Sequence, residues 1–168
     1  MPHIHRLIDF VVTVYIVHKD KVLLVDHKKL KRWLPIGGHI ELDEDPEQAL
    51  FREIKEECGL KVDIYGKKPS IPSKRIKFLY TPIFLNIHQI APKTTHKHIG
   101  LVYFARSKSD KVILNHKEHN AIRWFSREEL EKRRFNLRPS VVFYVKEALG
   151  KLAWKTTIKE PRIEPSKF

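Results

Sequence analysis

Residues 38–60 read Gly-His-Ile-Glu-Leu-Asp-Glu-Asp-Pro-Glu-Gln-Ala-Leu-Phe-Arg-Glu-Ile-Lys-Glu-Glu-Cys-Gly-Leu. Within this stretch, Glu53, Glu56 and Glu57 stand at positions i, i+3 and i+4. At 3.6 residues per turn the three carboxylates share one face of a helix. Like charges at this spacing cost about 0.2–0.5 kcal/mol per pair on an isolated helix. The cluster therefore indicates that a cation binds against this face.

The residues around the glutamates specify a helix in spite of this repulsion. Asp45 is a favourable N-cap, and Pro46 suits the first helical position. Gln48 completes an Asp-x-x-Gln capping box. Gly59 is a typical residue just past a helix C-terminus. The sequence therefore predicts a helix over about 46–58.

An apolar stripe runs beside the acidic one. It consists of Leu50, Ile54 and Cys58, and we expect it to pack on the body of the domain. Cys58 is the single cysteine of the chain, which excludes an internal disulfide. Its place on the stripe indicates a small core residue and not a nucleophile. Arg52 is four residues before Glu56, so it can hold that carboxylate in place.

A glycine pair, Gly37 and Gly38, comes before this helix. Two adjacent glycines let the backbone approach a ligand closely and offer a bare carbonyl. Carboxylate and carbonyl oxygens suit Mg²⁺ or Mn²⁺ better than zinc. Because Mg²⁺ usually holds substrate phosphates as well, a phosphate compound is the expected partner.

The spacing of these residues resembles the signature of a known family, the Nudix hydrolases. That signature is Gly-x5-Glu-x7-Arg-Glu-U-x-Glu-Glu-x-Gly-U, where U is aliphatic. It falls here, without departure, on Gly38, Glu44, Arg52, Glu53, Ile54, Glu56, Glu57, Gly59 and Leu60. The resemblance implies an α/β fold, the Nudix α/β/α sandwich, in which residues 38–60 form a loop-helix-loop on a mixed β-sheet. It also implies Mg²⁺-dependent hydrolysis of a nucleoside diphosphate linked to some other group, X.

The same resemblance assigns roles to residues. The Gly37 carbonyl and the carboxylates of Glu53 and Glu57 match metal ligands. Glu56 matches a further ligand or a residue that orients water, and Arg52 is expected to orient the carboxylates. The remaining signature acid, Glu44, is expected to support the loop or to act from outside the ligand shell.

The general base stays open at this point. Family members often place another glutamate on a loop beyond the signature, and Glu118 occupies a comparable place before Arg-Trp-Phe at 123–125. His116 and His119 flank it and can also accept a proton near neutral pH. The candidates for substrate binding are Arg32, Gly38 and His39.

The bulk composition suits a single domain with a basic surface. The chain has 168 residues, of which 42% are hydrophobic, and a formal net charge of +13. We expect one domain over 1–154 and a tail over 155–168. The charge attracts polyanions, including nucleotides and RNA, and is densest near the signature at Lys28–Arg32. Removal of pyrophosphate from RNA 5′ ends and non-catalytic nucleotide or RNA binding therefore stay as alternatives.

Nothing in the sequence predicts a membrane segment. The longest apolar run, Phe10–Val17, includes a threonine and is too short to cross a bilayer. Because residues 1–6 lack a long apolar region and a small-residue cleavage site, we expect no signal peptide. We expect a cytoplasmic protein that is a monomer or a homodimer.

The remaining elements follow from apolar runs and turn signals. Strands are predicted at 8–17, 21–26, 60–65, 82–90, 97–106 and 121–125, with loops at 27–35 and 66–77. Ser126 and Glu129 form a capping box that predicts a short helix. A last helix is predicted over about 139–152, with Val142, Val145, Leu149 and Leu152 as its apolar stripe.

One histidine pair also has metal-ligand spacing. His96 and His98 are two residues apart, which places both on one face of a strand. No acidic residue or cysteine lies near them in the sequence. Solvated or hydrogen-bonded histidines are therefore the favoured interpretation.

Overall fold

The computed structural model of the chain describes residues 7–69, 71, 75–90 and 94–153. The predicted C-terminal tail over 155–168 lies outside the described residues. Within the described part, no helix is both long and apolar enough to span a membrane.

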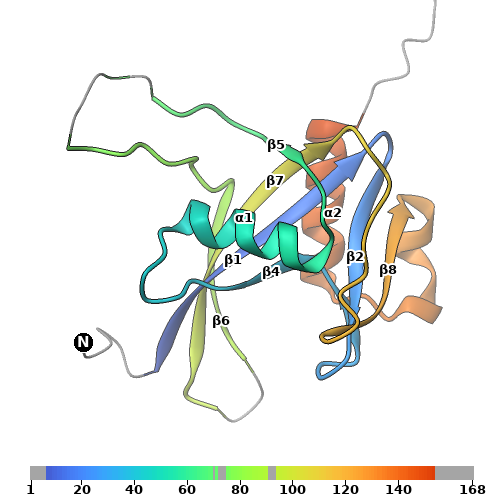
Figure 1. The fold of residues 1–168 in the computed structure, drawn as a ribbon. Coiled ribbons are helices and arrows are strands. Elements are labelled where there is room, and N and C mark those ends of the chain that lie inside the picture. Colours follow the sequence, from blue (N-terminus) through green and yellow to red (C-terminus); the bar gives the residue numbers. More distant parts are fainter. Residues whose placement is uncertain (1–6, 70, 72–74, 91–93, 154–168) are drawn as a thin grey trace, which may run out of the picture.

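The described residues contain one mixed β-sheet and two α-helices (Figure 1). The strands are β1 (Ile8–His18), β2 (Lys21–His27), β3 (Arg32–Leu34), β4 (Ile36–His39), β5 (Val62–Ile64), β6 (Phe84–Gln89), β7 (Lys97–Ser107) and β8 (His119–Ser126). Their order is β3-β2-β1-β7-β5, and β4, β6 and β8 pair with β1, β7 and β2, respectively. The central pair, β1 and β7, is parallel, whereas the other pairs are antiparallel.

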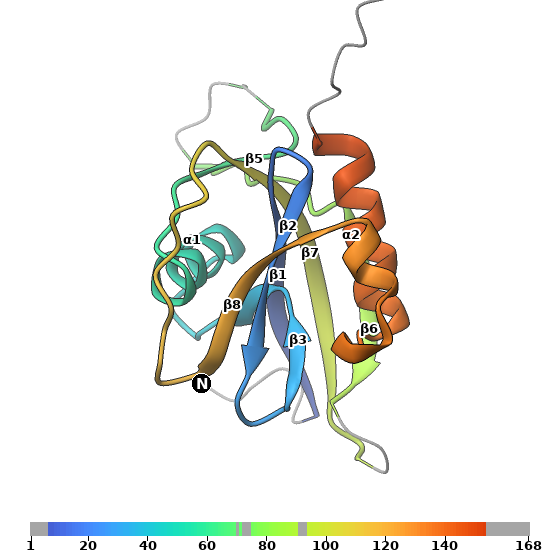
Figure 2. The same ribbon diagram turned by 90° about the vertical axis from the view of Figure 1, so that its right-hand side faces the viewer.

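The helices α1 (Pro46–Glu57) and α2 (Pro139–Leu152) cover opposite faces of this sheet (Figure 2). Each helix closes a separate apolar core. Leu50 and Ile54 of α1 pack with Val14 and Ile16 of β1. On the other face, α2 packs against alternate residues of β1 and β7. The α/β/α sandwich with a mixed sheet is confirmed.

The predicted ends of the first helix are confirmed. The Asp45 side chain accepts hydrogen bonds from the backbone N–H groups of Glu47 and Gln48, at 2.9 and 3.1 Å. In return, the Gln48 side chain accepts from the Asp45 N–H at 2.9 Å. Gly59 follows in the left-handed region, with φ of 66°. Cys58 is buried as predicted, and burial raises the pKa of its thiol to about 11.

The prediction of a loop over 27–35 was wrong in part. Arg32–Leu34 forms β3, which pairs with the end of β2, and the glycine pair lies in β4. β4 runs antiparallel to β1, with Gly38 opposite Val12. Both strands are only three or four residues long, and Pro35 separates them, so no alternating pattern of useful length exists. The consequence for function is that the glycines are fixed in a sheet.

The short helix predicted after β8 is a 3₁₀ turn, η1 (Glu128–Glu131), and its capping box forms only by half. The Glu129 carboxylate accepts from the Ser126 N–H at 3.1 Å. The Ser126 hydroxyl, however, donates to Glu128 at 2.6 Å and does not cap the turn.

A second 3₁₀ turn, η2 (Arg133–Phe135), leads to α2. The last helix is confirmed over Pro139–Leu152. Its buried stripe begins at Val141, not at Val142.

Candidate active site

Helix α1 directs two of its three signature glutamates, Glu53 and Glu57, toward β4. Glu53 and Glu57 are 8% and 4% exposed, whereas the side chain of Glu56 is 52% exposed. The i, i+4 pair faces the sheet, and the residue between them faces solvent. Two of the three predicted carboxylates are therefore buried, where an unbalanced charge is costly.

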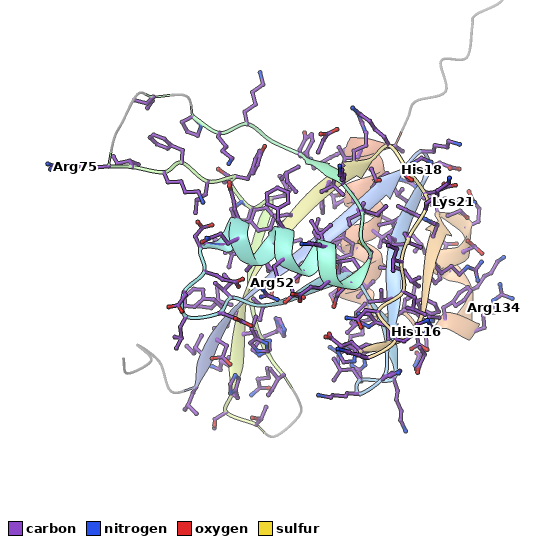
Figure 3. All side chains as sticks on the ribbon, viewed as in Figure 1. His18, Lys21, Arg52, Arg75, His116 and Arg134 are labelled. Carbon is purple, nitrogen blue, oxygen red and sulfur yellow. The ribbon has the colours of Figure 1, made fainter. Side chains whose placement is uncertain are left out.

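The cation that the structure places against Glu53, but not against Glu57, is Arg52 (Figure 3). Its guanidinium donates to both oxygens of Glu44, at 2.6 and 2.9 Å. It also donates to Glu53 at 2.7 Å and to Glu56 at 3.3 Å. A further hydrogen bond, of 3.0 Å, reaches the carbonyl of His39 on β4. Arg52 thus joins the loop, the helix and the sheet.

One guanidinium does not neutralise this many acids. Hydrogen bonding to Arg52 lowers the pKa of Glu44. In contrast, the pKa of Glu53 is raised, because burial outweighs the Arg52 contact and the Glu57 and Glu56 charges act in the same direction as burial. The inner part of the cluster therefore still favours a further positive charge.

The glycine pair makes room for the buried carboxylates. A Cβ atom on Gly38 would lie 2.2 Å from a carboxylate oxygen of Glu53. Gly37 has φ of +151°, and a Cβ there would lie 2.2 Å from the Val12 carbonyl oxygen. The Gly37 N–H donates to Glu57 at 3.2 Å. Both positions therefore need glycine, and β4 itself orients Glu57.

The loop that carries Glu118 is ordered by its own backbone and by the end of β2. The Lys117 N–H donates to the Asn115 side chain, and the His119 N–H donates to the Asn115 carbonyl, each at 3.0 Å. The Lys28 N–H donates to the Glu118 carbonyl at 3.0 Å. This turn brings Glu118 to Glu57, although 61 positions separate them in the numbering of the chain.

Glu57, Glu118 and His119 form one group. A carboxylate or imidazole atom from each lies within 4.8 Å of the others. The ring of His119 is fully buried, and its Nε2 is 3.1 Å from a carboxylate oxygen of Glu57. In the described part of the chain, neither nitrogen of this ring has a hydrogen bond of acceptable geometry. A cation bound here would account for the unsatisfied nitrogens of a buried imidazole beside two carboxylates.

These donors fit a divalent cation. The carboxylates of Glu53, Glu57 and Glu118 are hard oxygen ligands, which Mg²⁺ and Mn²⁺ prefer. His119 adds a nitrogen that Mn²⁺ accepts more readily than Mg²⁺ does. The structure thus brings the predicted ligand Glu57 together with Glu118 and His119, while Glu53 is held next to them on α1 by Arg52.

Other predicted residues lie further out. The side chain of Arg32 donates to the Leu30 carbonyl at 3.0 Å, within its own turn. His116 is exposed, and its carbonyl accepts from the Lys28 ammonium. The ring of His39 contacts His98 and does not point into the acidic cluster. An open groove beside Glu118 is lined by Glu56 and residues 113–118.

His119 was underrated in the sequence because it follows Glu118 in a polar run. Its position as the first residue of β8, opposite His27, is what buries it. Had the strand been predicted to begin at residue 119 instead of 121, His119 would have been identified as a strand residue next to Glu118.

Comparison with known proteins agrees with this geometry. The NUDIX domain family model matches residues 8–144. A Nudix-family hydrolase from Clostridium perfringens is 37% identical, with a TM-score of 0.73 over 85% of this chain and 97% of that one. Two more distant structures share the fold. One is a C. elegans Ap4A hydrolase, 19% identical with a TM-score of 0.61 over 83% of this chain and 93% of that one. The other is a MutT Nudix hydrolase from Burkholderia pseudomallei, 21% identical with a TM-score of 0.60 over 87% of this chain and 98% of that one.

No curated protein matches the chain. The family model nevertheless spans most of it, from β1 into α2. The chain therefore belongs to the Nudix hydrolase family, whose members are generally pyrophosphohydrolases of nucleoside diphosphate derivatives.

Proposed function

We propose that this protein hydrolyses a phosphoanhydride bond of a nucleoside diphosphate linked to another group X, with Mg²⁺ as its metal and Mn²⁺ as a substitute. The observation that carries the proposal is the convergence of Glu57, Glu118 and His119 within 4.8 Å beside the Gly37–Gly38 strand. Such a site suits a reaction in which phosphate charge must be neutralised and water must be activated.

When bound, the metal supplies charge neutralisation for the phosphates and a lowered pKa for water. The protein fixes the geometry in which this is useful. Glu57 is held on one oxygen by the Gly37 N–H, and its other oxygen faces His119. Glu53 is held by Arg52, which also fixes Glu44 and the β4 backbone. We assign Arg52 to positioning, because its guanidinium is already taken up by three carboxylates and the His39 carbonyl.

Exposure favours Glu118 as the general base over its histidine neighbours. Its side chain is exposed at the mouth of the groove, where a water molecule has access. The His119 ring is fully buried and packed against His27, with ring centroids 5.6 Å apart, so it is better placed to orient Glu57. His116 is exposed but lies outside the group of three.

The test is hydrolysis of a nucleotide panel by wild type and Glu57→Gln with Mg²⁺. The panel contains nucleoside triphosphates, nucleoside diphosphate sugars and dinucleoside polyphosphates. Glu57→Gln keeps the shape of the side chain and removes its charge, so kcat is expected to fall by at least about 100-fold. The matched control is Glu131→Gln, the same change at a side chain that is 72% exposed and lies after β8. Equal rates for wild type and Glu57→Gln on every active substrate would exclude catalysis through this site.

One observation favours an RNA 5′ end within this substrate class. The Lys28 backbone is hydrogen-bonded to Glu118, which places the basic segment Lys28–Arg32 next to the proposed general base. Exposed lysines in this segment suit an RNA whose 5′ polyphosphate is followed by the phosphates of its backbone.

A triphosphorylated oligonucleotide should then be hydrolysed with a higher kcat/KM than the free nucleotide. That advantage should shrink steeply as salt increases. RNA binding without turnover under any metal would instead support the non-catalytic alternative.

A further inference from the structure

A second polar cluster lies on the opposite face of the same sheet from the acidic residues of α1. Asp9 of β1 is paired with His98 of β7, and Val11 of β1 is paired with His39 of β4. Paired residues, and residues two apart, share a face of a sheet. Asp9, His39 and His98 therefore point to one side, which is the face that α2 covers further along the strands. His88 of β6 is opposite His98 and joins them.

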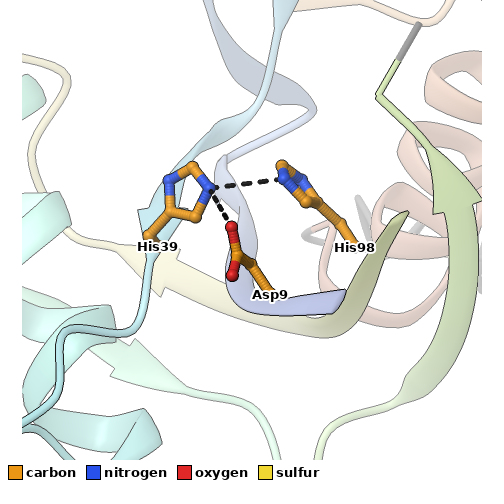
Figure 4. A group of neighbouring side chains, drawn as sticks. All are labelled: Asp9, His39 and His98. Carbon is orange, nitrogen blue, oxygen red and sulfur yellow. Dashed lines mark hydrogen bonds and ion pairs between the residues drawn. The ribbon is translucent and has the colours of Figure 1, made fainter. Parts of the chain in front are cut away.

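The three side chains converge on one point (Figure 4). The Nε2 atoms of His39 and His98 are 3.3 Å apart, and a carboxylate oxygen of Asp9 is 3.7 Å from the His39 Nε2. Two nitrogens bound to a tetrahedral zinc ion, each at about 2.0 Å, are themselves about 3.3 Å apart. The spacing between these donors therefore already matches that of ligands around one ion.

His96 lies beside this group, outside the three side chains whose ligand atoms all converge. Its Nε2 is 2.9 Å from the same carboxylate of Asp9. This buried nitrogen has no well-directed hydrogen bond within the described residues. Its ring lies against that of His98, with centroids 5.4 Å apart. An unsatisfied buried nitrogen aimed at the cluster is expected where a ligand completes it.

Two other interpretations explain less. A hydrogen-bonded pair accounts for His39 and His98, because one neutral ring can donate to the other, but it leaves His96 unsatisfied. An anion such as a phosphate suits several imidazoles, but the Asp9 carboxylate lies among them and would repel it. A cation satisfies the carboxylate and the imidazoles together.

We propose that Asp9, His39 and His98 form a binding site for a transition-metal ion, with Zn²⁺ as the preferred ion, and that His96, which already contacts Asp9, completes it when the ion binds. Three imidazoles and one carboxylate are ligands that Zn²⁺ takes in tetrahedral sites, whereas Mg²⁺ prefers oxygen. The site is distinct from the carboxylate site on α1 and does not depend on the proposed hydrolysis.

The bound ion would connect three strands. Asp9 is near the start of β1, His39 ends β4, and His98 is near the start of β7. Binding to the folded protein alone stabilises it in proportion to the logarithm of the free metal concentration. Zn²⁺ should therefore raise the melting temperature of the protein.

The test is titration of the tag-free, full-length chain with Zn²⁺ in the presence of excess Mg²⁺. Calorimetry measures the binding, and thermal unfolding measures the melting temperature. Co²⁺ is then used as a spectroscopic probe, because tetrahedral nitrogen ligation gives intense visible bands. All proteins carry Glu57→Gln, which weakens metal binding on α1. One equivalent of Zn²⁺ is expected to bind and to raise the melting temperature, and Co²⁺ should give the tetrahedral spectrum.

The comparison variants are His98→Ala and His39→Ala. Each should weaken Zn²⁺ binding by at least about 100-fold and remove the Co²⁺ bands, since loss of a group outside the ligand shell already costs about 10–100-fold. His39 is exposed, so His39→Ala tests the site with little effect on folding. His18→Gln, at the other end of β1, is the matched control and should bind normally. Absence of Zn²⁺ binding, or binding that both alanine variants retain, would overturn the proposal.

Discussion

The two polar clusters of this protein are opposites in composition but similar in construction. The acidic cluster gathers Glu44, Glu53 and Glu56 around a single cation, Arg52. The histidine cluster, which we define as Asp9, His39, His88, His96 and His98, gathers imidazoles around a single carboxylate. In each cluster, one side chain of opposite charge contacts several side chains of the same kind, but it does not balance all of them.

The ionisation of the two clusters shows the same imbalance. Burial raises the pKa of Glu53, and neighbouring carboxylates add to the effect. Burial lowers the pKa of His98 to about 4, and the imidazoles of His39, His88 and His96 add to the effect. Both groups are thus displaced toward their neutral forms. Burial, reinforced by crowding of like groups, is what the two clusters have in common.

The largest expected difference between the clusters is in how much activity and stability are lost when a nearby glycine is replaced by alanine. In Gly38→Ala the new Cβ meets a Glu53 oxygen at 2.2 Å, so the carboxylate must move. A displacement of this kind is expected to lower kcat by about 100-fold and to destabilise the fold by about 1–3 kcal/mol.

The matched variant near the histidine cluster is Gly100→Ala in β7, two residues after His98. Its Cβ would meet the Asn86 side chain at 3.1 Å, which a small rotation relieves. Steady-state kinetics and denaturant unfolding of both variants make the comparison. Equal losses would show that the acidic cluster is no more tightly packed than its counterpart.

A smaller effect is expected when the central cation is changed. Arg52→Ala removes the guanidinium that binds Glu44 and Glu53, and a roughly 10–100-fold fall in activity should follow. Arg52→Lys keeps the charge but not the fork that reaches Glu44 with two nitrogens, so it should recover only part of the loss. Full recovery of kcat by lysine would mean that charge alone organises the site.

The smallest expected effect is on pH dependence, and it has opposite signs in the two clusters. The ordinary pKa of His98 is 6.5 and its folded value is about 4, so its contribution to stability is complete above pH 6.5 and is lost as pH falls toward 4. Glu53, whose pKa is raised above 4.5, contributes stability below pH 4.5 that is lost as pH rises through its folded pKa.

Melting temperatures of the metal-free protein from pH 4 to 7 test these signs. Subtracting the profile of His98→Asn from that of wild type isolates one contribution, and subtracting that of Glu53→Gln isolates the other. The two difference profiles should slope in opposite directions, and slopes of the same sign would contradict the assignment.

The acidic cluster was largely predictable from the sequence because its parts are local. The helix, its caps and the glutamates lie within residues 38–60, and fixed spacing on a helix determines which face they share. Asp45 and Gln48 formed the predicted capping box for the same reason. The fold class followed from the family resemblance of this one stretch.

The histidine cluster was not predictable because its parts are distant. His39 and His98 are 59 residues apart, and Asp9 comes from a third strand. No local pattern predicts an acidic partner beside His96 and His98. That partner is supplied by the parallel pairing of β1 with β7 and by the short β4, which contains two glycines and has no alternating pattern. Short strands and long-range pairing are what local patterns do not encode.

The parallel pairing of β1 with β7 also has a consequence for how the chain folds. Ten residue pairs join these strands, beginning with residue 8 opposite residue 97, so a long segment must close before any of them forms. Contacts between such distant residues slow folding, because the entropy of loop closure is lost before the pairing compensates for it. Asp9 and His98 meet only in this step, whereas the α1 helix can form locally. A metal that binds the histidine cluster would therefore act late, by slowing the reopening of a sheet that has already closed.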